Sequence, residues 1–335
     1  LTTLFYNGTR FKNLGDQLNK LKVKKAKLLP LVILAFAYSG FAQDQTSHEG
    51  HMHGVQPTKA QVDSILKANV VPEAHAEKFG KLVIQDVGGR MMPVNTYASE
   101  LLRKLSKHDN YEGLTADQIF LSMQESPLLW YEVPIIYLSP KKGDTIRNII
   151  GAKESDKFIR LSSFFDDKGQ YRLSSYLEEA YKAQTPNGYQ KEFKEIDQRV
   201  NLLYNTIEGR SLRIFPLPND PNNKWVSPVE FRRSNMKVED SLYGSFVKGG
   251  FNMYLHTLDA AKKQSDPDFK EAEKMLASFK KTQHMYGADV MLSDKKINTE
   301  VLYNKYDIFK KLFSWYMYAG TLMFILLIIQ IFRNN

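Results

Sequence analysis

Apolar residues recur with a helical period over much of the chain. The clearest stripe covers residues 189–207, where apolar positions are spaced by 4, 3, 4, 3 and 4. It predicts a helix with one face packed against a core or a partner helix, and we favour core packing. Further helices are predicted near residues 238–263 and 266–286, the second with Pro267 in its first turn. The members of the stripe are Tyr189, Phe193, Ile196, Val200, Leu203 and Ile207.

Three threonines stand just before shorter helical patterns. Thr58 precedes AQVDSILKANV, Thr96 precedes YASELLRKL and Thr115 precedes ADQIFLSMQ. A hydroxyl at the first turn accepts a hydrogen bond from an otherwise unpaired backbone N–H. Each threonine is therefore predicted to be a helix N-cap.

Patterns typical of strands are few. The best are residues 81–86, ahead of Gly88 and Gly89, and residues 130–138, where Pro134 limits the segment to an edge strand or extended chain. Residues 212–218 are predicted to be extended. The fold class is therefore mainly α, with little β structure and one small hairpin.

Residues 312–332 (LFSWYMYAGTLMFILLIIQIF) form an uncharged run of 21 residues. As a helix it is about 31 Å long, enough to cross a bilayer. Trp315, Tyr316 and Tyr318 lie in its first turns, as in an interfacial aromatic belt. The preceding residues 298–311 contain neither Gly nor Pro, which predicts one continuous helix from the domain into the span.

Residues 28–42 (LLPLVILAFAYSGFA) are a shorter apolar run of 15 residues. Two interpretations stay open, a transmembrane segment and a signal-like segment whose Gly40-Phe41-Ala42 resembles a cleavage site. We favour the span, because at least 27 residues precede it. In both cases the basic stretch before it stays cytoplasmic and the domain after it lies outside.

These patterns predict the organisation of the chain. Residues 1–7 end a preceding transmembrane helix, 8–27 are a basic cytoplasmic link, 28–42 the transmembrane or signal-like segment, 43–57 a mobile linker, 58–311 a periplasmic helical domain and 312–332 a transmembrane helix. The predicted location is the inner (cytoplasmic) membrane, with several passes and the main domain in the periplasm.

Charge and cysteine content exclude several classes of function. The net charge of +9 comes largely from residues 1–27, and the rest of the chain without Arg333 holds 38 basic and 36 acidic residues. A nucleic-acid partner is therefore not expected. The chain has no cysteine, so disulfides, thiolate metal sites and covalent haem attachment on this chain are excluded.

Histidines are the candidate metal ligands. His48, His51 and His53 lie close together in HEGHMHG, a density that can hold a transition metal or haem iron. No rigid spacing orients them, and we favour a solvated linker. The other histidines are isolated and are predicted to be ordinary surface or half-buried residues: His75, His108, His256 and His284. Gly88-Gly89-Arg90 lacks the surroundings of a phosphate loop and is interpreted as a turn.

Five segments together resemble a known family. They are FGKLVIQDVGGRMMPVNTYASELLRKLS (79–106), ADQIFLSM (116–123), WYEVPIIYL (130–138), IFPLPNDPNNKWVSP (214–228) and VLYNKYDIFKKLFSWYMYAG (301–320). They are similar to the central region of fused system II cytochrome c biogenesis proteins, in which a ResB-like half is joined to a CcsA-like half (the CcsBA type). GGRMMPVNTYASELLRK is the most specific part.

The resemblance implies haem export or handling, and attachment of haem to the CxxCH motif of apocytochrome c. It implies haem as cofactor, and lipid membrane, apocytochrome c and the rest of the same fused chain as partners. The family's tryptophan-rich signature is absent, since Trp130, Trp225 and Trp315 stand apart. We assign no catalytic residue, metal ligand or haem ligand on this chain.

Two other functions remain as alternatives. A non-catalytic, membrane-tethered envelope scaffold would bind a protein partner without affecting haem attachment. A metal-capturing domain would use His48, His51 and His53.

Overall fold

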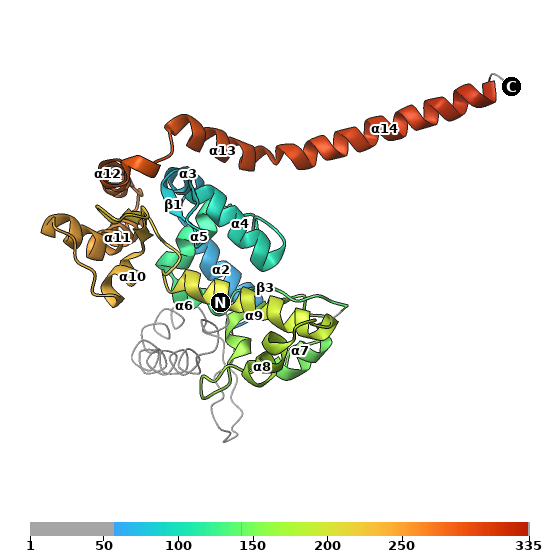
Figure 1. The fold of residues 1–335 in the computed structure, drawn as a ribbon, viewed down its shortest axis with the longest axis horizontal. Coiled ribbons are helices and arrows are strands. Elements are labelled where there is room, and N and C mark those ends of the chain that lie inside the picture. Colours follow the sequence, from blue (N-terminus) through green and yellow to red (C-terminus); the bar gives the residue numbers. More distant parts are fainter. Residues whose placement is uncertain (1–56, 142, 334–335) are drawn as a thin grey trace. The chain divides into compact units, whose positions relative to one another are not determined.

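The computed structural model describes residues 57–141 and 143–333, which divide into two compact units (Figure 1). Within the described residues the elements are mainly helices, with three two-stranded antiparallel sheets. The mainly helical prediction is confirmed. The prediction of a single hairpin falls short of the three strand pairs found, because all six strands have only two to four residues and leave hardly any periodic signal.

The first unit comprises residues 57–68, 105–107 and 126–205 of the described chain. Arg147 lies fully buried in it and donates to the carbonyl oxygens of Leu138, Ser139 and Asp156 at 3.0–3.1 Å. The guanidinium thus provides hydrogen-bond donors for three backbone carbonyl groups that lie next to β3 and β4 in the chain. The elements are α2 (Lys59–Asn69), α6 (Pro127–Trp130), β3 (Pro134–Tyr137), α7 (Asp144–Ile150), β4 (Phe158–Arg160), η2 (Leu161–Phe164), α8 (Ser174–Lys182) and α9 (Gly188–Ile207).

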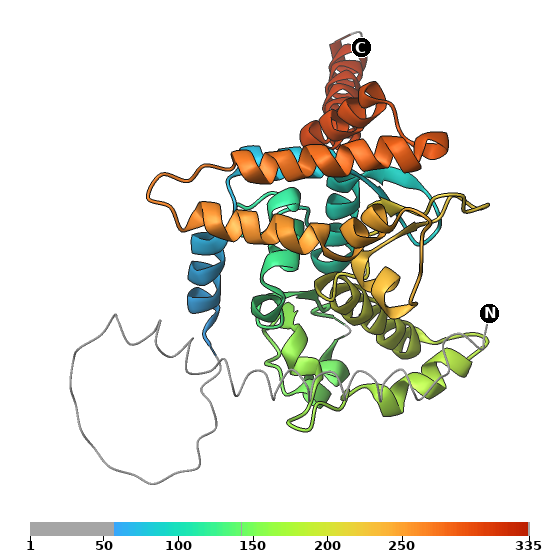
Figure 2. The same cartoon turned by 90° about the vertical axis from the view of Figure 1, so that its left-hand side faces the viewer.

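The second unit comprises residues 69–104, 108–125 and 206–333 of the described chain. Its aromatic core includes Phe79, Phe120, Phe251 and Tyr254, whose rings lie 5.7–6.3 Å apart in successive pairs. Figure 2 shows α11 and α12 lying side by side over this core. The elements are α3 (Glu73–Gly80), β1 (Val83–Gln85), β2 (Met91–Pro93), α4 (Val94–Ser106), α5 (Ala116–Glu125), β5 (Phe215–Pro216), β6 (Trp225–Val226), α10 (Pro228–Arg233), α11 (Ser241–Lys262), α12 (Lys270–Tyr286), η3 (Ala288–Val290), α13 (Asp294–Tyr306) and α14 (Ile308–Arg333).

The strongest helical pattern is confirmed. Helix α9 spans Gly188–Ile207, and five of the six stripe residues are at most 4% exposed. Tyr189, the first of the stripe, is 40% exposed because it lies in the first turn. The stripe is core packing, as predicted.

Two of the three predicted N-caps are confirmed. Thr58 and Thr115 each accept a hydrogen bond from the backbone N–H three residues later, and a glutamine there bonds back to the threonine N–H. This is a capping box. Thr96 is not a cap, because α4 begins at Val94, directly after β2.

Two other local predictions are wrong in their bounds. Helix α12 begins at Lys270 and not at Asp266, so Pro267 lies before it. Residues 130–138 are not one extended segment, since Trp130 ends helix α6 and the strand starts at Pro134. In both cases a proline marks a boundary that periodicity alone does not locate.

The predicted continuous helix into the span is also interrupted. Helix α13 ends at Tyr306, Asp307 has a left-handed backbone with φ 46°, and α14 begins at Ile308. Aspartate adopts this conformation more readily than most residues, so a helix can end here without Gly or Pro.

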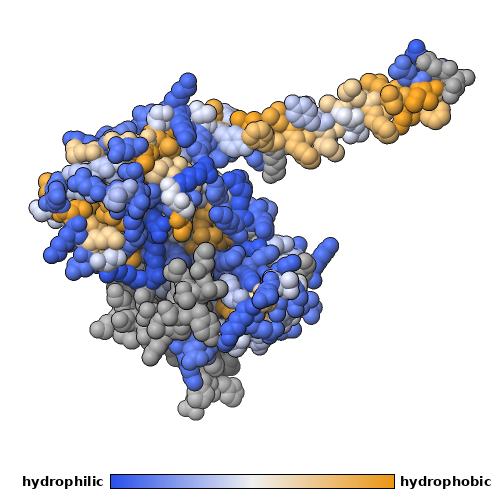
Figure 3. All heavy atoms as spheres, in the orientation of Figure 1, coloured by the Kyte–Doolittle hydropathy of each residue, from blue (hydrophilic) through white to orange (hydrophobic). Residues whose placement is uncertain are grey.

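Helix α14 contains one stretch, Lys311–Arg333, that is long and apolar enough to cross a membrane. Residues 311–333 are exposed, and Figure 3 shows hydrophobic residues along most of the helix. The stretch matches the predicted span at 312–332 within one residue at each end. The apolar run at 28–42 lies outside the described residues.

Candidate functional site

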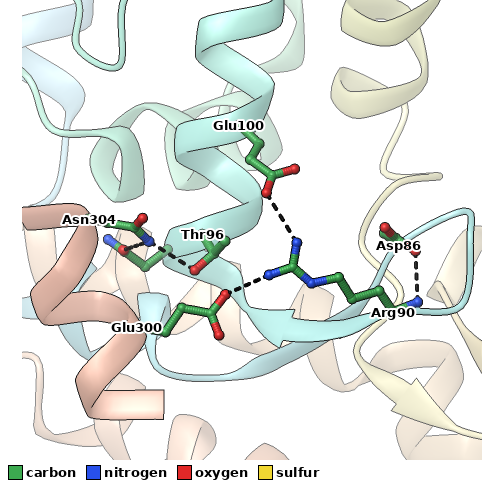
Figure 4. A network of polar contacts seen from close by, with 7 residues as sticks. Asp86, Arg90, Thr96, Glu100, Glu300 and Asn304 are labelled. Atoms are coloured by element: carbon green, nitrogen blue, oxygen red, sulfur yellow. Dashed lines mark hydrogen bonds and ion pairs between the residues drawn. The ribbon is translucent and has the colours of Figure 1, made fainter. Parts of the chain in front are cut away.

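The turn between β1 and β2 is built by the GGR segment. The N–H of Gly89 donates to the Asp86 carbonyl at 3.2 Å, and the N–H of Arg90 donates to the Asp86 carboxylate at 2.9 Å. Gly89 has φ 88°, which only glycine adopts easily. The segment is therefore a turn after a short strand, as predicted, and the Arg90 side chain runs from it toward Glu100 and Glu300 (Figure 4).

Helix α13 packs on this hairpin with apolar side chains. Ile297 is 2% exposed and belongs to one cluster with Val83 of β1, Trp225 of β6 and Leu292. The half-buried Val301, one turn further along α13, packs against the same cluster. Burial of these side chains holds the helix that leads into α14.

Polar side chains continue the same interface (Figure 4). Arg90 contacts Glu300 of α13 at 3.0 Å and Glu100 of α4 at 3.5 Å. The amide of Asn304, also on α13, donates to Thr96 Oγ1 at 2.9 Å and to Asn95 Oδ1 at 3.1 Å. We call these six residues the α13 network: Arg90, Asn95, Thr96, Glu100, Glu300 and Asn304.

The network reaches a buried carboxyl group. Asn95 Nδ2 donates to Asp117 Oδ2 on α5 at 2.9 Å. Asp117 is 3% exposed, and its Oδ1 is buried without a hydrogen-bond partner among the described residues. The carboxyl lies against the α-carbon of Gly80, where an added Cβ would come within 2.5 Å of Oδ2.

Burial disfavours the ionised form of this carboxyl. It raises the pKa of Asp117 from 3.8 to about 7, and the nearby Glu77 and Glu73 act in the same direction. The hydrogen bond from Asn95 partly offsets this effect. Asp117 therefore changes its charge near neutral pH, at the inner end of the chain of side chains that reaches α13.

His75 is a second buried ionisable group, which corrects the prediction of an ordinary surface or half-buried histidine. It is 3% exposed, its Nε2 lies 2.9 Å from the Tyr254 hydroxyl, and its ring packs 5.1 Å from that of Phe269. Burial lowers the pKa of His75 to about 4. The imidazole is neutral at physiological pH.

The remaining predicted histidines form no site in the described structure. His108, His256 and His284 are exposed, and no group of three potential metal-binding side chains occurs among the described residues. The candidate ligands His48, His51 and His53 lie outside those residues.

A small cavity of about 130 Å³ lies in the second unit, lined among others by Arg232, Phe251 and Asn252. Sites for drug-sized ligands begin at roughly 300 Å³. This cavity is therefore too small for haem, and we assign it no ligand.

Sequence reasoning missed the polar contacts that matter most here. Asn95, Asp117 and Asn304 are ordinary polar residues in helical patterns, and nothing local marks them. One signal was present, because Asn95 and Thr96 lie inside GGRMMPVNTYASELLRK. The structure explains that segment as the turn, strand and helix that hold α13.

The described residues thus form two helical units, the second of which includes a candidate membrane span. No family model matches the chain. Protein NrfI of Wolinella succinogenes is 28% identical to it over 249 residues, which are 73% of this chain and 26% of NrfI. The chain spans about a quarter of the length of that relative.

Proposed function

We propose that this chain is the membrane-tethered helical part of a cytochrome c maturation protein and supports the attachment of haem to apocytochrome c. The similarity to NrfI supports a role in cytochrome c maturation in general. The resemblance of five segments to the fused ResB/CcsA-like proteins supports the finer assignment.

One structural observation links that resemblance to a role. The most specific segment, residues 88–104, forms the turn after β1, strand β2 and most of α4, and these elements hold α13 through the α13 network. Helix α13 leads directly into the apolar α14. The segment therefore has the physical task of fixing the domain to the part of the chain that enters the membrane.

The proposed arrangement follows the predicted domain boundaries. Residues 1–7 end one span, 8–27 lie in the cytoplasm, 28–42 form the next span, and the domain at 58–311 lies in the periplasm before the span at 312–332. Haem and apocytochrome c are handled together with the rest of the protein. In this proposal the domain supports haem delivery or the docking of apocytochrome c.

Arg90→Glu in the full-length protein tests this role. The new carboxylate faces Glu100 and Glu300, so two ion pairs become repulsions and α13 loosens from the hairpin. Exposed pairs are weak, and the expected loss of stability is about 1–2 kcal/mol. The domain stays folded, while mature c-type cytochromes, measured by haem staining of membranes, fall several-fold.

Arg103→Glu is the matched control. Arg103 is likewise an exposed arginine; it lies on α4 and pairs at 3.7 Å with Asp109, outside the α13 network. It should leave cytochrome levels unchanged at equal amounts of protein. Equal levels of mature c-type cytochromes in both variants would contradict the proposed role of the α13 network.

A further inference from the structure

Helix α13 has two different faces. Ile297 is buried, and Glu300, Val301 and Asn304 are half-buried against the hairpin and α4. On the opposite side exposed residues recur at spacings of 4, 3 and 4, the period of a single helix face. These residues are Lys295, Thr299, Leu302 and Tyr306.

The exposed face changes character along the helix. Its first half carries Lys295 and Thr299, whereas its second half carries Leu302, 51% exposed, and Tyr306, 50% exposed. Tyr303 beside them is 37% exposed. We call Leu302, Tyr303 and Tyr306 the outer apolar face of α13. A contiguous group of exposed apolar side chains usually marks a binding surface.

The turn that joins this face to α14 is held by hydrogen bonds and a ring contact. The N–H of Asp307 donates to the carbonyls of Tyr303 and Asn304 at 3.1 and 3.4 Å, and the N–H of Lys311 donates to the Asp307 carbonyl at 3.1 Å. The ring of Phe309 packs edge-on against that of Tyr303, with centroids 5.4 Å apart. The turn between α13 and α14 is therefore a specific conformation with aromatic side chains on both sides.

Lipid is the partner that this chemistry fits. Tyr303 of the outer apolar face contacts Phe309 of α14, a helix along which exposed hydrophobic residues continue (Figure 3). This region combines tyrosines with a lysine, since Lys311 Nζ lies 5.8 Å from the centroid of the Tyr306 ring. Tyrosine and lysine are enriched where a helix meets the headgroup region of a membrane.

We propose that the outer apolar face of α13 lies in the headgroup region of the bilayer, at the point where the chain continues past Asp307 into α14 and the membrane. This rests on the proposed membrane attachment through α14. The polar network on the opposite side of α13 then fixes the second unit against the membrane surface.

Fluorescent labelling of single cysteines tests the proposal, because the chain has no cysteine of its own. The full chain is reconstituted into vesicles of equal parts phosphatidylcholine and phosphatidylglycerol. An environment-sensitive dye is attached in Leu302→Cys and Tyr306→Cys. Two variants serve as controls. Gly249→Cys is at an exposed position of α11, where an added Cβ meets no atom within 4 Å, and Leu322→Cys is in the middle of α14.

The expected result is that lipids spin-labelled in the headgroup region quench the dye at 302 and 306 by about half. The dye at 249 is quenched by aqueous iodide alone, and the dye at 322 by spin labels deep in the acyl chains. Iodide quenching at 302 and 306, with 322 in lipid, would overturn the inference and leave the membrane attachment intact.

The remaining outcomes are also decisive. Protection of 302 and 306 from both quenchers would mean that protein covers the face, and this overturns the lipid assignment. Iodide quenching at 322 would show that α14 is not in the bilayer, and the membrane attachment in the proposed function would fail with it.

Discussion

Gln283→Ala is expected to lower the free energy of unfolding of the second unit by about 3–5 kcal/mol. Gln283 is fully buried on α12. Its Oε1 accepts from the Val83 N–H at 3.1 Å, and its Nε2 donates to the carbonyls of Val83 and Ile214 at 2.8 and 3.0 Å. One side chain thus satisfies three backbone groups, along the edge of β1 that faces away from β2.

Alanine would leave these three groups buried without partners, and each such group costs about 1–3 kcal/mol. Urea unfolding in mild detergent, followed by circular dichroism, measures the effect. Gln264→Ala is the control, because Gln264 is exposed in the segment after α11 and its replacement should change stability by less than about 0.5 kcal/mol. An equal, small effect in both variants would show that Gln283 does not support β1.

The second large effect concerns Asp117. Its pKa is raised from 3.8 to about 7 in the folded protein, so between these values the folded state binds more protons than the unfolded state. Stability from this group is therefore present at acid pH and is lost as the pH rises from about 4 to 7. The change corresponds to about 4 kcal/mol.

His75 acts in the opposite direction over nearly the same range. Its pKa is lowered from 6.5 to about 4, so the unfolded state binds more protons there, and stability rises with pH from about 4 to 6.5. The contribution is about 3 kcal/mol. The two effects nearly cancel in the parent protein.

Because the two effects oppose each other, removing one group at a time should change the stability relative to the parent with pH in opposite directions in two variants. Asp117→Asn should become more stable, relative to the parent, as the pH is raised from 4 to 7, and His75→Gln should become less stable. Unfolding measured at several pH values, as the difference between variant and parent, removes the contributions of all other groups. Asp289→Asn, at an exposed aspartate, should match the parent throughout. The same pH dependence of the stability difference in both variants would contradict the opposite pKa shifts of Asp117 and His75.

The predictable part of the fold is the part set by local pattern. The stripe of α9 repeats over five turns, and the capping boxes at Thr58 and Thr115 lie within four residues, so both are visible in sequence. The strand pair β3–β4 joins segments that are distant in sequence, Pro134–Tyr137 and Phe158–Arg160, so local patterns do not reveal it.

The polar contacts of α13 were not predictable for the same reason. Asn95 bonds to Asp117 across 22 positions and to Asn304 across 209. The break between α13 and α14 at Asp307 left only a weak signal in the sequence. Aspartate tolerates the left-handed region, but no glycine marks the position. These long-range pairs connect the segment with the most specific resemblance to the helix that precedes the span.

The central claim is that this domain supports cytochrome c maturation. The most direct measurement is covalent haem in c-type cytochromes from cells whose full-length protein has residues 58–293 replaced by a flexible linker, with α13 and the span kept. The account predicts loss of c-type cytochromes, while non-covalent b-type cytochromes and the membrane level of the shortened protein stay unchanged. Parental amounts of c-type cytochromes in these cells would contradict it.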